Sequence, residues 1–344
     1  MITTLSTHST GMPRRARRLA VAATAAAALL LTGCAGSDSG SAASGKDGGL
    51  VPVSMGISPW IGYGQWYVAK EQGILDEHGL NVDMVQLNTD ADKISAFASG
   101  QVNATNLATH TAMMLQEAGV DLKIVLIQDY SEAADAMIAG PSVTSIDELA
   151  GKKIAYEQGA TSDLLLHAAL NEAGLTMDDI TPVPMAASDA AAALISGQVD
   201  VAVTYEPYIT TAVGDDPSLK SIYDGSDAPG LISDALVVSD ELINESPETV
   251  QALVDSWGEA VDFYNSDVDA GRTIMAEAAS EDPEALASAF DGVLYFGKAE
   301  NAKAFSGEYV DTVLPLAERV ATQAGLLTAP VDLKSLYDSQ FATN

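Results

Sequence analysis

The sequence predicts an α/β fold made of two similar lobes. From Leu50 onward, short β-like runs alternate with helical stretches, which is typical of βαβ units that form a parallel sheet. The alternation occurs in two blocks that contain a matching segment: residues 96–103 read AFASGQVN and residues 193–200 read ALISGQVD. Both segments predict a helix, a Ser-Gly-Gln turn and a strand, so we expect two related α/β lobes rather than a short-period repeat.

The first block contains four expected strands and three expected helices. The strands are 51–57, 82–87, 102–107 and 122–128, and the helices are 65–72, 91–98 and 111–118. Gly73, Gly100 and Gly119 follow the three helices, where a residue in the left-handed region commonly ends a helix.

The second block repeats this pattern, and the last third of the chain is mainly helical. Strands are expected at 153–156, 180–184, 199–204 and 236–238, and helices at 162–173 and 189–195. Ser246, Pro247 and Glu248 then predict a helix start, with an N-cap, a proline in the first position and an acid that matches the helix dipole. Apolar residues at helical spacing follow, Trp257 among them, and we expect them in the core.

Composition and charge exclude several classes of function. Apolar residues make up 47% of the chain and charged residues 19%, which is enough apolar surface for a large core. The chain has 16 Lys and Arg against 48 Asp and Glu, a formal charge of −32. Such acidity disfavours nucleic acid and anionic lipid surfaces, which are bound mainly through basic residues. One cysteine, Cys34, excludes a disulfide framework and a Cys-rich zinc site.

The first residues predict an export signal. Four arginines (Arg14, Arg15, Arg17 and Arg18) precede the apolar run 19–31, which is too short to span a bilayer. Leu31-Thr32-Gly33-Cys34 resembles the lipobox of bacterial lipoproteins, which implies a signal peptide at 1–33 and lipidation of Cys34. The alternatives are an ordinary signal peptide with a chance cysteine, and export by either the Sec or the Tat route. Residues 34–49 are rich in Gly and Ser and predict a flexible linker between a membrane anchor and the body.

Several short segments of the body resemble one family. They are 58–63 (SPWIGY), 67–69 (YVA), 73–75 (GIL), 149–155 (LAGKKIA), and 197–200 (GQVD) followed by 205–208 (YEPY). These segments are similar to solute-binding lipoproteins of nitrate/sulfonate/taurine-type (NitT/TauT-type) ABC importers. The resemblance implies a periplasmic-binding-protein type II fold, with two Rossmann-like lobes joined by two crossing strands and a ligand in the cleft between them.

The resemblance also implies the organisation and the partners. Lobe 1 would comprise 50–138 plus 236–344, and lobe 2 would comprise 139–235. We expect a monomer on the outer face of the membrane that delivers a small molecule to ABC permease and ATPase subunits, with no cofactor, metal or catalytic residue. Some relatives make a thiamine pyrimidine with a cysteine-rich motif that this chain lacks. A secreted lyase or synthase on the same scaffold is therefore the less favoured alternative.

The expected site follows from strand topology. In open α/β sheets, ligands bind beyond the carboxyl ends of the strands, where helix N-termini favour anions. The residues predicted to bind the ligand are Trp60, Tyr63, Gln65, Trp66, Asn88, Thr109, Tyr130, Thr161, Ser162, Tyr205 and Glu206, with Lys93 as the nearest cation. Trp66 could instead pack in the core, and Glu206 could instead stabilise a helix start.

The ligand prediction has two branches. The first is a sulfonate or taurine-like anion or zwitterion, held by backbone N–H groups and by polar side chains such as Thr161 and Ser162. The second is a planar nitrogen heterocycle such as a thiamine pyrimidine precursor, favoured by the aromatic residues on the loops and by Glu206, because aromatic faces stack rings and attract cations.

Overall fold

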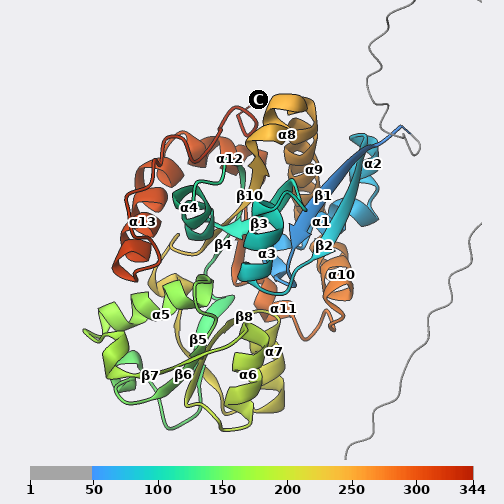
Figure 1. Cartoon of the computed structure of the whole chain (residues 1–344). Coiled ribbons are helices and arrows are strands. Elements are labelled where there is room, and N and C mark those ends of the chain that lie inside the picture. Colours follow the sequence, from blue (N-terminus) through green and yellow to red (C-terminus); the bar gives the residue numbers. More distant parts are fainter. Residues whose placement is uncertain (1–48, 344) are drawn as a thin grey trace, which may run out of the picture. The chain divides into compact units, whose positions relative to one another are not determined.

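The computed structural model describes residues 49–343, in which eleven strands form two sheets (Figure 1). The predicted signal peptide and Cys34 lie outside the described residues, as does most of the predicted linker. Within the part of the chain that is described, no helix is both long and apolar enough to cross a membrane.

The first sheet has six strands in the order β11-β4-β10-β3-β1-β2. Their bounds are β1 Val51–Ile57, β2 Leu80–Gln86, β3 Ala104–Ala108, β4 Leu122–Ser131, β10 Ser233–Ser239 and β11 Val293–Tyr295. Strand β1 is parallel to β2 and β3, whereas β10 runs antiparallel to both β3 and β4.

Alternate residues of this sheet enter two separate cores. On β10, for example, Leu236 and Val238 belong to one buried cluster, and Ala235 and Val237 to the other, because successive side chains of a strand point to opposite faces. The first cluster contains Trp66 and Trp257, and the second contains Phe305. The helices associated with this sheet are α1 Gln65–Glu71, α2 Ile74–Glu77, α3 Asp90–Ala98, α4 Thr109–Glu117, α8 Asp240–Glu245, α9 Pro247–Ser266, α10 Val268–Ala279, α11 Ala287–Phe290, α12 Lys298–Phe305 and α13 Leu314–Gln323.

The second sheet has five strands in the order β7-β6-β8-β5-β9 and lies in the lower part of Figure 1. Its elements are β5 Asp135–Ala139, β6 Lys153–Tyr156, α5 Thr161–Glu172, β7 Thr181–Pro184, α6 Ala187–Ile195, β8 Val201–Tyr205, α7 Tyr208–Asp215 and β9 Lys220–Asp224. Strands β6, β7 and β8 are parallel, and β5 is antiparallel to β8 and β9. Short helical turns complete the described chain: η1 Ile61–Tyr63, η2 Ile146–Glu148, η3 Met177–Asp179, η4 Gly225–Asp227 and η5 Tyr309–Val313.

Most of the predicted elements are confirmed, but the sheets are not purely parallel. Strands β5, β9 and β11 were not predicted, and β5 and β10 run against their neighbours. Helix α9 begins as predicted, with Pro247 in its first turn after Ser246, although the Ser246 side chain makes no capping hydrogen bond. The glycines predicted to end helices have positive φ angles, for example 72° at Gly100.

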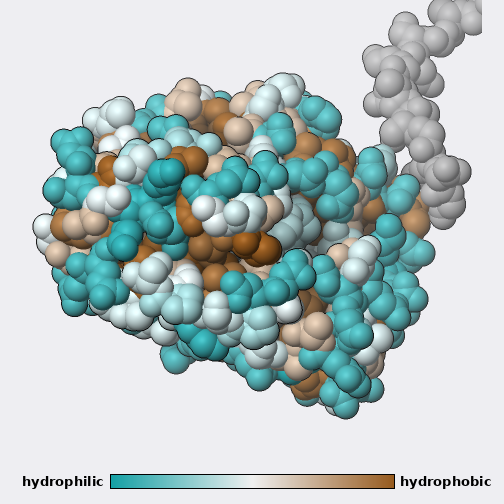
Figure 2. Space-filling view, turned by 90° about the horizontal axis from the view of Figure 1, so that it is seen from below, coloured by the Kyte–Doolittle hydropathy of each residue, from teal (hydrophilic) through white to brown (hydrophobic). Residues whose placement is uncertain are grey.

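The chain passes between the sheets twice, from β4 to β5 and from β9 to β10. The predicted lobe limits lie a few residues beyond these passages, since residues 135–138 pair within the second sheet and residues 233–235 within the first. We propose that the two lobes divide at the passages themselves. Figure 2 shows a mostly hydrophilic face with hydrophobic residues gathered near its middle, in keeping with the acidic composition.

Candidate functional site

A cavity is lined by residues of both sheets. Its walls comprise Ser58, Trp60, Tyr63, Asn88, Thr89, Asp90, Lys93, Ala108, Asp135, Glu157, Ala160, Thr161, Ser162, Tyr205 and Asp234. Most of these residues follow the carboxyl ends of β1, β2, β3, β6 and β8, as predicted for ligand sites in open α/β sheets. The antiparallel strands β5 and β10 reach the same edge with their first residues.

Acidic side chains dominate the cavity. Asp90, Asp135, Glu157 and Asp234 provide four carboxyl groups, whereas Lys93 is the one basic residue among the lining residues. Within residues 49–343, no group of three or more His, Cys, Asp and Glu side chains is arranged to hold a metal ion.

The ammonium group of Lys93 is held by neighbours in the same wall. Lys93 is only 3% exposed, and its Nζ lies 2.8 Å from Asp90 Oδ1 and 3.3 Å from Ser58 Oγ. It also lies 5.4 Å from the centre of the Tyr63 ring, a cation–π distance. Burial tends to raise the pKa of Asp90, but the Lys93 ammonium outweighs that effect and the pKa is lowered. The single cation of the cavity is therefore already neutralised by Asp90.

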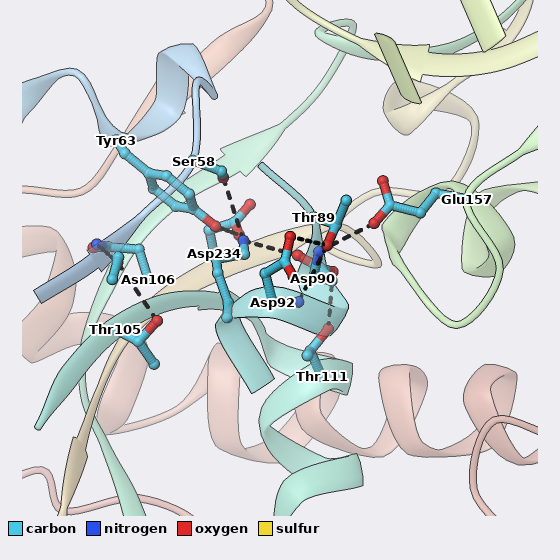
Figure 3. Close-up of polar contacts among 12 residues, drawn as sticks. Ser58, Tyr63, Thr89, Asp90, Asp92, Thr105, Asn106, Thr111, Glu157 and Asp234 are labelled. Carbon is cyan, nitrogen blue, oxygen red and sulfur yellow. Dashed lines mark hydrogen bonds and ion pairs between the residues drawn. The ribbon is translucent and has the colours of Figure 1, made fainter. Parts of the chain in front are cut away.

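Asp135 and Asp234 are buried carboxyls that start strands of different sheets. Burial, reinforced by the charge of Asp234, raises the pKa of Asp135 to about 8. Burial also raises the pKa of Asp234 to about 6, although the Tyr63 hydroxyl donates to Asp234 Oδ1 at 2.6 Å. Figure 3 shows Tyr63 and Asp234 side by side. Burial therefore makes both groups resist ionisation, and a bound positive charge would favour their ionised forms.

Glu157 reaches from the second sheet to the first. It follows β6, and its Oε1 accepts the backbone N–H of Asp90, the first residue of α3, at 3.0 Å (Figure 3). Its Oε2 accepts the backbone N–H of Ala187, the first residue of α6, at 3.4 Å. One carboxylate therefore contacts the N-termini of two helices that belong to different sheets.

Aromatic rings from the two sheets meet at the cavity. Trp60 and Tyr205 are packed edge to face, with ring centres 5.7 Å apart, and Tyr205 also packs on Tyr208 at 5.3 Å. Trp60 depends on the neighbouring Gly62, because a Cβ at that position would collide with Trp60 Nε1 and with the carboxyl group of Asp129. The aromatic pair offers flat apolar surface to a ligand.

Six of the eleven residues predicted to bind a ligand line this cavity, as does Lys93. They are Trp60, Tyr63, Asn88, Thr161, Ser162 and Tyr205. Their role in binding stays a prediction.

The other five predicted residues are not among those that line the cavity. Trp66 is completely buried, donates from Nε1 to Asn106 Oδ1 at 2.8 Å and packs on Trp257, so the core alternative holds for it. Glu206 accepts the N–H of Thr210 at 2.9 Å within the first turn of α7, which matches the helix-start alternative.

The side chains of Thr109 and Tyr130 make other contacts, and the side chain of Gln65 is buried. Thr109 Oγ1 shares hydrogen bonds with Ser233 Oγ and Tyr309 OH, at 2.7 and 2.8 Å. The Tyr130 ring packs on Phe296, with ring centres 4.5 Å apart. Gln65 starts α1 and is completely buried.

The sequence analysis missed the acidic residues of the cavity as binding candidates. Glu157 directly follows β6, and Asp90 begins the helix that follows β2. The rule that ligands bind beyond the carboxyl ends of strands, which located Asn88 and Thr161, could therefore also have found these two residues. Asp135 and Asp234 gave no such signal, because they stand at the beginning of strands. Only antiparallel pairing brings those beginnings to the edge of the sheet where the parallel strands end.

Comparison with known proteins places the chain in a family. The family model described as NMT1/THI5 like matches residues 61–267, more than half of the chain. The chain belongs to the NMT1/THI5-like family. A binding protein of Brucella abortus is 26% identical over 296 residues, covering 85% of this chain and 92% of that protein. The riboflavin-binding protein RibY of Chloroflexus aurantiacus is 25% identical over 305 residues, covering 85% of each.

Solved structures confirm the predicted periplasmic-binding-protein fold of this NMT1/THI5-like chain. The periplasmic aliphatic sulphonate binding protein SsuA of Escherichia coli aligns with a TM-score of 0.71 at 19% identity, covering 84% of this chain and 92% of that one. The desulfurization enzyme DSZB aligns with a TM-score of 0.60 at 18% identity, covering 85% and 97%. The scaffold is therefore shared by proteins named for binding and by one named as an enzyme.

Proposed function

We propose that this protein is the extracytoplasmic solute-binding component of an ABC importer, and that its solute carries a positively charged or hydrogen-donating nitrogen. The importer role is supported by the family, the fold and the names of the relatives. The charge of the solute rests on one observation: four carboxyl groups line the cavity, and its one lysine is paired with one of them. A cation entering this cavity gains favourable interactions with carboxylates that otherwise repel one another.

Within this class, a planar nitrogen heterocycle is the first candidate. Trp60 and Tyr205 line the cavity from different sheets, and aromatic side chains bind flat rings by stacking and cations by their π faces. RibY, which is named for binding riboflavin, is a relative along most of the chain. Asp135 and Asp234 would then accept hydrogen bonds from ring or amino nitrogens.

A sulfonate or taurine-like zwitterion is the second candidate. Several relatives are named for sulfonates or taurine. The N-terminus of α5 adjoins the cavity at Thr161 and Ser162, where backbone N–H groups favour an anionic group. A zwitterion would place its ammonium group near Asp135 and Asp234, whereas a plain alkanesulfonate has neither a positive charge nor an N–H donor for those carboxyls.

We propose a binding role rather than an enzymatic one. His110 is buried, is not among the lining residues and has its pKa lowered to about 4 by burial. The proposed mature protein is a lipid-anchored monomer attached through Cys34, and it delivers its solute to permease and ATPase subunits.

The proposal is tested by calorimetry and thermal melting of the purified protein with three probes: an aminopyrimidine, taurine and methanesulfonate. We expect the aminopyrimidine to bind, and at 100 times its Kd to raise the free energy of unfolding by about 2.7 kcal/mol. Binding of methanesulfonate alone would contradict the proposed charge of the solute. Chemical conversion of the bound probe, followed by chromatography, would contradict the binding role and favour the lyase or synthase alternative.

A further inference from the structure

One side chain, Glu157, occupies a position between two helix N-termini. Its Oε1 accepts the N–H of Asp90 at the start of α3, and its Oε2 accepts the N–H of Ala187 at the start of α6. Helix α3 belongs to the first sheet and α6 to the second. Figure 3 shows the Glu157 carboxylate pointing from the second sheet towards the first turn of α3.

Both helices have N–H groups that an anion would stabilise. The first N–H groups of a helix lack partners within the helix and carry partial positive charge. The N-cap of α6 is Ala186, which has no side-chain acceptor. At α3, the Thr89 side chain accepts the N–H of Asp92, which leaves the N–H of Asp90 to Glu157.

Glu157 is positioned for this role by the start of α5. The backbone N–H of Glu157 donates to Ser162 Oγ at 2.9 Å, which orients the residue after β6. The nearest lysine, Lys93, forms its 2.8 Å ion pair with Asp90. The carboxylate of Glu157 is therefore held by backbone N–H groups rather than by an ion pair of its own.

We propose that Glu157 is a specificity-determining residue that acts as an internal anion. It fills the place where backbone donors of both sheets converge, and its charge keeps anionic groups of a ligand out of that place. The inference deepens the proposed function, on which it rests, since it explains how a cavity rimmed by helix N-termini selects against anionic solutes.

The test measures anion binding by the purified protein and its variants, with methanesulfonate and inorganic sulfate as probes. Glu157→Ala frees the N–H groups of Asp90 and Ala187, and we expect it to bind methanesulfonate at least about tenfold more tightly than the wild type, in calorimetry at low ionic strength. Glu157→Gln keeps a side-chain acceptor of the same size without the charge, and we expect a smaller gain.

Glu148→Ala is the matched control. Glu148 belongs to the same part of the chain, is exposed and is not among the cavity residues, and it too accepts a backbone N–H, that of Thr144, at 2.6 Å. Its replacement removes the same charge, so we expect no gain in anion binding. Circular dichroism and melting establish that each variant is folded, and Glu157→Gln carries the test if Glu157→Ala does not fold.

Two results would overturn the inference. One is equal affinity of the wild type and of the folded Glu157 variants for methanesulfonate. The other is an equal gain in Glu148→Ala, which would make the effect one of total charge. Failure of the proposed function would give a different result. The wild type would then bind neither the aminopyrimidine nor taurine, whether or not the Glu157 variants bind anions more tightly.

Discussion

Asp135 is a buried carboxyl of the cavity wall whose pKa is raised to about 8 by burial. It is 4% exposed and faces the charges of Asp234, Asp90 and Glu206, and its backbone N–H donates to Ser131 Oγ at 2.9 Å. We expect Asp135→Asn to weaken the binding of a quaternary ammonium probe by about tenfold or more, because a buried charge pair is lost. Calorimetry at pH 8.5 measures this. Asp147→Asn, which removes an exposed carboxylate outside the cavity, is the control, and an equal loss there would refute the prediction.

The free energy of unfolding of the ligand-free protein should decrease as pH rises. The reason is that folded Asp135 keeps its proton over a pH range in which the unfolded chain has already released it. The pKa of an aspartate in an unfolded chain is about 3.9, whereas that of folded Asp135 is about 8. Between these values the folded state binds more protons, so the free energy of unfolding decreases with increasing pH. We expect Asp135→Asn to melt at least about 2 °C above the wild type at pH 8.5, with a smaller difference at pH 5, by calorimetry. A difference independent of pH would rule this out.

Binding of a cation should show the opposite trend with pH. Asp234, with a pKa of about 6, and Asp135, with a pKa of about 8, lose their protons in the empty cavity between pH 5 and pH 9. Each deprotonation adds a negative charge that attracts the ligand, so the Kd of a quaternary ammonium probe, which cannot itself titrate, should decrease over this range. Titration calorimetry at intervals of one pH unit checks the trend. Asp135→Asn should abolish the decrease in Kd at the upper end of this pH range, where Asp135 titrates. A Kd that rises with pH would contradict the prediction.

At the scale of elements, the turn between β1 and α1 sets the position of Trp60. Gly62 in η1 leaves no room for a methyl group, because Trp60 Nε1 and Asp129 Oδ2 lie too close to the position that its Cβ would take. Gly62→Ala should therefore displace Trp60 and lower the free energy of unfolding by about 1–3 kcal/mol, as overpacking does. Gly214→Ala in α7 is the control, since nothing lies within 4 Å of its Cβ position and alanine favours a helix. Urea unfolding compares the two, and equal stabilities would count against the argument.

At the scale of the whole molecule, only one of the three tryptophans is placed to report an occupied cavity. Trp60 lines the cavity and packs on Tyr205 of the other sheet, whereas Trp66 and Trp257 pack on each other in the core. We expect a bound aminopyrimidine to change tryptophan fluorescence, and Trp60→Phe to lose most of that change. Trp66→Phe should keep it if the variant folds. A change that persists in Trp60→Phe would assign the signal to the core.

The fold was more predictable from sequence than the cavity. Periodicity and helix-ending glycines such as Gly100 depend on neighbouring residues, so they located β1, β6 and the helices that were predicted within a few residues. Strand β5 gave no comparable signal, because it follows β4 after a short passage without a glycine or proline. Asp135 and Asp234 reach the cavity only through antiparallel strand pairing, which a pattern of residue types does not encode.

The two passages between the sheets have a mechanical consequence. Asp135 begins the strand that follows the first passage, and Asp234 is the second residue of the strand that follows the return. If the lobes rotate against each other, these crossings are the pivot. A ligand that pairs with these two acids would then bind at the hinge itself.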